Sequence, residues 1–226
     1  MKKINFIIST LILITTSSCV TSLRPLVTYK TAIADNRVVG AWEQEGQEYI
    51  VQEVFNSDFY KKNKGDLEKG RELNGQLSEK SKRDSVLYSK SYIIKYSKEG
   101  LKYFLLGSMI KLNGRLFMNF VTADLKSTDS TKDVPEFNFG SPINSHTIAR
   151  VEFTNTNTMK LDFIDGGYLH DQIKAGRMKI KNETDELYGT FLITASTREL
   201  QQFLEKYGND SRFFSKENSV TLIRKS

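Results

Sequence analysis

Side chains that commonly carry metal chemistry are scarce in this sequence. The 226 residues include two histidines, His146 and His170, and one cysteine, Cys19. The histidines do not form the His-Glu-x-x-His spacing of a zinc enzyme. A zinc site needs three or four protein ligands. The sequence therefore predicts no metal site.

Acid–base and nucleophilic chemistry also lack a recognisable pattern. His170 precedes Asp171, but adjacent side chains point in different directions on a helix or a strand, so the two do not form a dyad by themselves. Asp162 and Asp165 are carboxylates that could converge, but we place the first on a solvent-facing strand surface and the second in a turn. Ser108 lies in a predicted strand rather than in a Gly-x-Ser-x-Gly turn. We expect neither catalysis nor a bound cofactor.

The first nineteen residues carry the clearest functional signal. Two lysines are followed by the apolar run Ile4–Ile14, then by small polar residues that include Thr16, Ser17 and Ser18, and by Cys19. This order describes an export signal. Because the cysteine directly follows the small residues, the segment resembles a bacterial lipoprotein signal. That resemblance implies removal of Met1–Ser18 and acylation of Cys19, which would attach the protein to a membrane.

Two alternatives for this segment are a membrane span and a structural cysteine. A spanning helix needs about 20 apolar residues, and the run here is about half as long. Asn5, Ser9 and Thr10 interrupt it. A single cysteine cannot form an internal disulfide. We therefore favour the lipid anchor.

The residues after Cys19 bear on the membrane to which the protein is sorted. Val20 and Thr21 follow the cysteine, without the aspartate that would suggest retention in the inner membrane by the enterobacterial rule. An acidic run that would resemble a surface-export tag is also missing. We expect attachment to the outer membrane, with the protein facing the periplasm.

Composition favours a folded domain and argues against nucleic acid as a partner. The chain has 33 lysines and arginines against 27 aspartates and glutamates, with 38% hydrophobic residues. These charges are interspersed, whereas nucleic-acid-binding proteins usually gather basic residues on one face. The hydrophobic content is typical of a globular protein.

We divide the chain into a signal peptide over residues 1–18, a lipidated tether over 19–37 and one β-rich domain over 38–226. Tyr60–Ser85 is rich in charge and contains three glycines, which disfavour a helix by about 1 kcal/mol each. We expect this segment to be a solvated loop or insertion, with a binding arm as the alternative. Residues 122–145 are polar and predict a second long loop.

Alternating or continuous apolar residues predict strands along the domain. Asn113-Gly114 joins two of them, and this dipeptide is typical of a tight hairpin turn. After a first strand that opens at residues 40–42, the predicted strands cover residues 49–55, 92–96, 101–110, 115–121, 147–153, 159–163, 178–180, 187–194 and 220–224.

One helix is strongly indicated, over Ser196–Tyr207. Ser196 and Glu199 have the spacing of a capping box, and Gly208 could end the helix in the left-handed conformation. A shorter segment, Tyr168–Ala175, predicts two helical turns closed by Gly176.

The order of these elements predicts a mainly β fold with eight to ten strands. Strands and helices do not alternate, so a parallel sheet is not expected. An antiparallel barrel or curved sheet is favoured, because closure removes exposed strand edges.

The first predicted strand of the domain begins with Gly40-Ala41-Trp42, which resembles the Gly-x-Trp start of lipocalins. The resemblance implies an eight-stranded barrel in which Trp42 closes one end and Arg224, from the last strand, packs over the indole. Two features depart from a minimal lipocalin: the Tyr60–Ser85 insertion, and a helix that closely precedes the last strand. The alternative is that Trp42 is an ordinary large core residue.

The chain also resembles small lipoproteins of Bacteroidetes-type bacteria, a likeness that implies no activity. Its basis is the early Gly-x-Trp together with Thr194–Gln201, Thr-Ala-Ser-Thr-x-Glu-Leu-Gln. Two tripeptides, Asp84-Ser85-Val86 and Asp129-Ser130-Thr131, resemble the short O-glycosylation motif of these bacteria.

These observations leave two main hypotheses and a weaker third. The protein is a lipid-anchored barrel that binds an apolar or amphipathic ligand, or a structural accessory subunit that holds an envelope protein and has a filled barrel. An enzyme without local motifs is the third. Barrels of this size often fill their interior with side chains, whereas a cavity of several hundred Å³ would favour a ligand.

Overall fold

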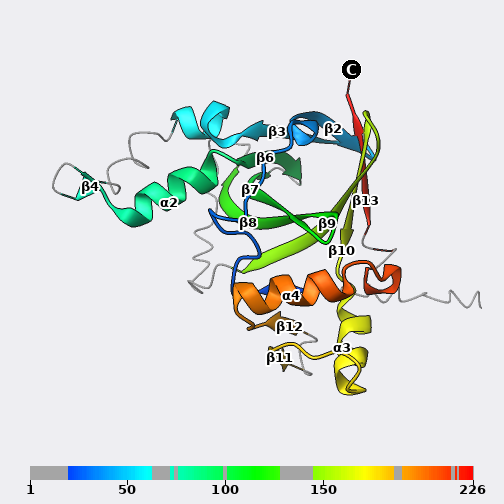
Figure 1. Ribbon diagram of the computed structural model, residues 1–226. Coiled ribbons are helices and arrows are strands. Elements are labelled where there is room, and N and C mark those ends of the chain that lie inside the picture. Colours follow the sequence, from blue (N-terminus) through cyan, green and yellow to red (C-terminus); the bar gives the residue numbers. More distant parts are fainter. Residues whose placement is uncertain are drawn as a thin grey trace, which may run out of the picture.

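Eight antiparallel strands close into a barrel at the centre of the computed structural model (Figure 1). The structure describes residues 20–62, 72–73, 76–98, 101–127, 145–185, 190–214, 217 and 219–225. Each barrel strand pairs with the next one in the sequence, and the last pairs with the first. The strands are β2 (Gly40–Gln44), β3 (Gln47–Glu53), β6 (Ser91–Lys98), β7 (Leu101–Leu112), β8 (Arg115–Ser127), β9 (His146–Asn155), β10 (Thr158–Phe163) and β13 (Val220–Arg224).

This up-and-down order confirms the predicted mainly β barrel. The turn at Asn113-Gly114 joins β7 to β8, and both residues have positive φ, 44° and 80°, as a type I′ turn requires. Residues 178–180 do not form the expected strand. Met178 and Ile180 are buried in the hydrophobic core, but they lie in a segment between α3 (Gly166–Lys174) and β11 (Asn182–Asp185) that is not a strand. The strand expected over 187–194 is described as β12 (Thr190–Ile193).

Three short strands extend the sheet outside the barrel. β1 (Thr21–Ser22) pairs with β9 beyond the point where β10 ends, and β12 lies parallel to β1. β11 (Asn182–Asp185) completes this edge. A separate small hairpin contains β4 (Glu72–Leu73) and β5 (Gln76–Leu77).

The segment predicted to be a tether is folded against the barrel, so that prediction is wrong for residues 20–37. Val20, Leu26 and Val27 are at most 3% exposed. The Leu26 backbone N–H donates to Asn119 Oδ1 at 2.9 Å, and its carbonyl accepts from Gln201 Nε2 at 2.8 Å. The segment is held by side chains from distant parts of the sequence.

The Tyr60–Ser85 segment also differs from its prediction. The helix α2 (Glu79–Tyr88) begins inside it, and the Ser78 hydroxyl caps the helix by accepting from the Ser81 N–H. The three glycines of the segment precede this helix, so they do not interrupt it. Residues 63–71 and 74–75 lie outside the described part. Of the loop expected over 122–145, residues 122–127 belong to β8, and 128–144 are not described.

α4 (Thr197–Tyr207) confirms the strongest helix prediction, including its capping box of Ser196 and Glu199. Gly208 does not take the expected left-handed conformation, since its φ is −67°. A Cβ at this position would lie 2.5 Å from the Leu204 carbonyl oxygen and 2.7 Å from Phe117 Cζ. Close approach of the helix end to the barrel therefore explains the glycine.

The second helix, α3 (Gly166–Lys174), matches the short helical segment that the sequence predicts. Asp165 caps it by accepting from the Tyr168 N–H at 2.8 Å. Figure 1 shows α3 and α4 near β11 and β12, whereas α2 extends away on another side of the barrel.

Two main hydrophobic clusters lie on opposite faces of the barrel wall. One fills part of the interior and includes Trp42, Met109, Met118 and Met159. The other lies outside, where the apolar stripe of α4 packs with the N-terminal segment against β7, β8 and β9. The outer face of β7, β8 and β9 is thus covered by α4 and the N-terminal segment, and the barrel interior is only partly filled.

Candidate binding cavity

The barrel encloses an apolar cavity of about 410 Å³. Strand positions supply most of the lining, many of them at alternate residues that face the interior, and Val38 and Ser145 contribute from outside the strands. Among the described residues, none that lines the cavity is charged. The lining residues are Val38, Tyr49, Val51, Ile94, Tyr96, Leu105, Met118, Phe120, Val121, Thr122, Ser145, Thr147, Met159, Leu161, Phe163, Val220 and Leu222.

Trp42 and Arg224 meet at the closed end of this barrel. The Trp42 side chain is fully buried, and its Nε1–H donates to the Val38 carbonyl at 2.8 Å. The Arg224 guanidinium carbon lies 4.3 Å from the centroid of the indole. The structure thus brings together the two residues that the sequence singled out.

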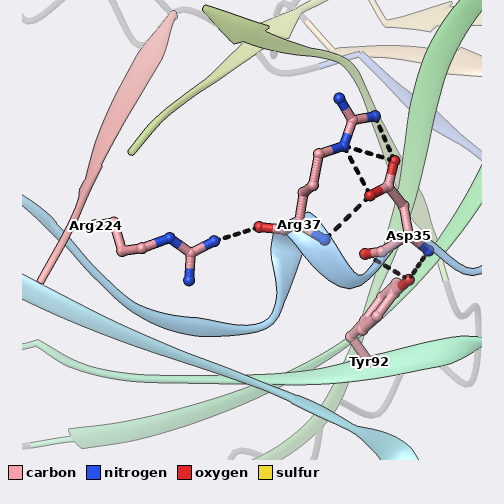
Figure 2. Close-up of polar contacts among 4 residues, drawn as sticks. All are labelled: Asp35, Arg37, Tyr92 and Arg224. Atoms are coloured by element: carbon pink, nitrogen blue, oxygen red, sulfur yellow. Dashed lines mark hydrogen bonds and ion pairs between the residues drawn. The ribbon is translucent and has the colours of Figure 1, made fainter. Parts of the chain in front are cut away.

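Arg224 also holds the short 3₁₀ helix η1 (Asn36–Val38), which crosses this end. Its guanidinium donates to the carbonyls of Val39 at 2.8 Å and Arg37 at 2.6 Å; Figure 2 shows the second bond. These hydrogen bonds hold η1 across the end of the barrel.

Tyr92 fixes the chain just before η1. Its hydroxyl accepts from the Asp35 N–H at 2.6 Å and donates to the Asp35 carbonyl at 3.1 Å (Figure 2). The Asp35 carboxylate pairs with Arg37, and the hydrogen bond from the Arg37 side chain lowers the pKa of this carboxyl. The sequence did not single out these three residues.

A row of three tyrosines begins beside Trp42, which is the direct partner of Tyr49 in the pairing of β2 with β3. Tyr49, Tyr96 and Tyr103 are direct neighbours across β3, β6 and β7. The ring centroids of the first pair are 5.4 Å apart, and those of the second pair stack at 4.7 Å. The alternation around Tyr49 and Tyr96 was visible in the sequence, but the register that aligns them was not.

The other chemical candidates do not meet in one site. His146 contacts Asn119, whereas His170 is on α3, 3.9 Å from the Asp171 carboxylate. Ser108 forms a 2.7 Å hydrogen bond with Ser91. Within the described ranges, no group of three His, Cys, Asp or Glu side chains could hold a metal ion.

The expectation that Asp162 faces solvent is wrong. It is 1% exposed and pairs with Arg150 at 2.9 Å and Lys160 at 2.8 Å. The neighbouring carboxylate, Asp165, caps α3 and does not converge with it on a cleft. These carboxylates stabilise the fold rather than form an acid–base pair.

The three modification candidates lie in different parts of the chain. Ser85 is half-buried in α2, while Cys19 and Ser130 lie outside the described residues. Over the described part of the chain, no helix is long and apolar enough to cross a membrane.

Comparison with known proteins gives no relative for this chain. No family model, curated protein or solved structure matches it. The geometry of the barrel is therefore the basis for inferring function.

Proposed function

We propose that this protein binds a small apolar or amphipathic molecule inside its barrel. The observation that carries the proposal is the cavity of about 410 Å³, in which none of the described lining residues is charged. Binding pockets for small molecules typically have volumes of roughly 300–1,000 Å³ and mostly apolar walls. A cavity of about 150 Å³ already accommodates benzene, so this one has room for a considerably larger ligand. The cavity favours ligand binding over the accessory subunit with a filled barrel.

The lipocalin resemblance supports the same proposal. The closed end combines Gly40, Trp42 and Arg224 in the arrangement that the Gly-x-Trp resemblance implies. Eight strands in sequential order suit a lipocalin-like barrel. We propose that the chain is a lipocalin-like binding protein rather than an enzyme.

Ligand binding can be tested with the neutral fluorescent probe N-phenylnaphthylamine. Val220 lines the cavity, whereas Thr221, the next residue on the same strand, is exposed on the outer face. Val220→Trp should fill part of the cavity and weaken probe binding by about tenfold or more, equivalent to 1.4 kcal/mol. Thr221→Trp is the matched control and should bind normally. Absence of probe binding by the unmodified protein, or equal binding by both variants, would reject the proposal.

We further propose that the protein is exported and anchored to the outer membrane through acylated Cys19, facing the periplasm. The support is the N-terminal sequence: two lysines, a short apolar run and small residues before the cysteine. Cys19→Ala should therefore leave the detergent phase in a partitioning experiment with whole-cell extract. Unchanged partitioning of this variant would refute the lipid anchor, and digestion by protease added to intact cells would place the protein on the outer surface.

A further inference from the structure

The polar side chains that the described residues contribute to the cavity all carry hydroxyls. Among the described residues, five polar side chains contribute to the lining: Tyr49, Tyr96, Thr122, Ser145 and Thr147. Tyr49 and Tyr96 are direct neighbours on β3 and β6, and Ser145 and Thr147 lie at the start of β9, while most of the remaining lining is apolar. A ligand that enters this cavity would therefore contact a mostly apolar wall and a few hydroxyls.

None of these five hydroxyls makes a hydrogen bond with another described residue, and those of Tyr49 and Tyr96 belong to rings that are in contact with each other. Burial raises the pKa of both side chains, so both stay protonated at neutral pH and can donate. Stacking on Tyr103 limits the movement of the Tyr96 ring. The cavity wall thus offers two positioned neutral donors.

The local charge disfavours an anionic ligand. Glu45, in the turn between β2 and β3, lies close enough to raise the pKa of Tyr49 further by charge repulsion. The described lining contains no lysine or arginine that could pair with a carboxylate or phosphate. Removing an unpaired charge from water is costly. An anionic head group in this cavity would therefore lose hydration without gaining a partner.

We infer that the cavity selects an uncharged amphiphile, with its apolar body inside the barrel and a hydroxyl or carbonyl group at Tyr49 and Tyr96. This inference rests on the proposed ligand-binding function and adds the class of ligand. It distinguishes long-chain alcohols and similar neutral molecules from fatty acids, and also from cationic amphiphiles, for which the described lining supplies no carboxylate partner.

A matched series of ligands tests this selectivity. A primary alcohol, a carboxylic acid and a quaternary ammonium compound with the same alkyl chain should each be measured for displacement of N-phenylnaphthylamine at about pH 8, where the acid is ionised. We expect the alcohol to bind at least about tenfold more tightly than the acid. The affinity of the acid should increase as the pH falls toward its own pKa, while that of the alcohol should change much less.

Three tyrosine variants test which hydroxyls recognise the head group. Tyr49→Phe and Tyr96→Phe should each weaken alcohol binding about 3–10-fold, the usual effect of one hydrogen bond, and leave binding of the corresponding alkane unchanged. Tyr103→Phe is the control, because this residue stacks on Tyr96 but does not line the cavity.

The possible failures can be told apart. If neither the probe nor any member of the series binds, the proposed function itself is rejected. If the probe binds but the acid or the ammonium compound binds as tightly as the alcohol, only the inferred ligand class is overturned. If the alcohol binds equally well to the wild type and to both cavity-facing tyrosine variants, the assignment of the two hydroxyls is overturned.

Discussion

At the scale of single residues, Gly40 is what allows Arg224 to lie over Trp42. A Cβ on Gly40 would be only 2.4 Å from the Arg224 Nη1, and its φ of +138° is a conformation that other residues rarely adopt. The guanidinium can therefore lie against the backbone, where it contacts the indole and two carbonyls at once. Gly40, the Trp42 indole and the Arg224 guanidinium together form the closed end of the cavity.

Loss of the Arg224 guanidinium should destabilise the closed end of the barrel. Arg224→Ala removes the contact with the Trp42 ring and the hydrogen bonds to Arg37 and Val39. We expect the free energy of unfolding to fall by about 1–3 kcal/mol in urea denaturation. Arg224→Lys should recover only part of this loss, because an ammonium lacks the planar fork. A double-mutant cycle with Trp42→Phe should show coupling, and fully additive effects would contradict it.

His146 should make stability depend on pH. Asn119 Oδ1 accepts from the Leu26 N–H, so Asn119 Nδ2 must donate to an unprotonated His146 Nδ1, 3.1 Å away. Burial lowers the pKa of His146 below its value of 6.5 in the unfolded chain. The unfolded state therefore binds this proton more readily, and stability should fall as the pH is lowered below about 6.5.

Unfolding in urea at several values between about pH 5 and pH 8 measures this dependence. His146→Gln keeps a hydrogen-bond acceptor without the titrating ring, and its stability should change less over the same interval. An identical pH profile for the wild type and the variant would contradict the assignment.

At the scale of elements, a buried ion pair joins two neighbouring barrel strands, β9 and β10. Asp162 on β10 contacts Arg150 on β9, and its other oxygen accepts from the Ser219 hydroxyl, next to β13, at 2.6 Å. Burial alone would raise the pKa of Asp162, but hydrogen bonds from Lys160, Ser219 and Arg150 outweigh it and lower this pKa. The carboxylate therefore remains ionised inside the wall.

Asp162→Asn should destabilise the barrel strongly. The variant leaves Arg150, whose side chain is only 14% exposed, without its charge partner. Breaking a buried pair in this way typically costs about 3–5 kcal/mol. Asp171→Asn is a suitable control, because the Asp171 side chain is 76% exposed. Equal urea midpoints for the two variants would show that the pair does not stabilise the fold.

Elements marked by a short sequence motif could be predicted from the sequence. The contacts that these elements make with distant parts of the chain could not. The capping box of Ser196 and Glu199 and the turn at Asn113-Gly114 are local patterns, and both occur as expected. Alternation correctly set Asp162 apart from Leu161 and Phe163, but it could not show that other chain segments cover the outer face of β10. The tyrosine row was missed for the same reason, since it depends on the register between separate strands.

At the scale of the whole molecule, the N-terminal segment is part of the fold. Residues 20–33 lie against the barrel, and Thr197 of α4 donates to the Pro25 carbonyl at 2.7 Å. Their apolar residues are irregularly spaced, so no periodic pattern marks the segment as buried. If Cys19 carries a lipid, the anchor precedes a buried Val20 directly. The proposed anchor would then hold the barrel close to the membrane surface.

Leu26→Ala distinguishes this packed segment from a flexible tether. Leu26 is fully buried, and its main chain bonds to Asn119 and Gln201. Truncating a buried leucine typically costs about 2–5 kcal/mol, whereas truncation in a tether would have almost no effect on unfolding. Arg24→Ala changes an exposed side chain two positions away and should alter the free energy of unfolding by less than about 0.5 kcal/mol. Urea denaturation of the protein lacking residues 1–19 measures both variants without the membrane. Indistinguishable curves for the two would mean that the N-terminal segment does not stabilise the barrel.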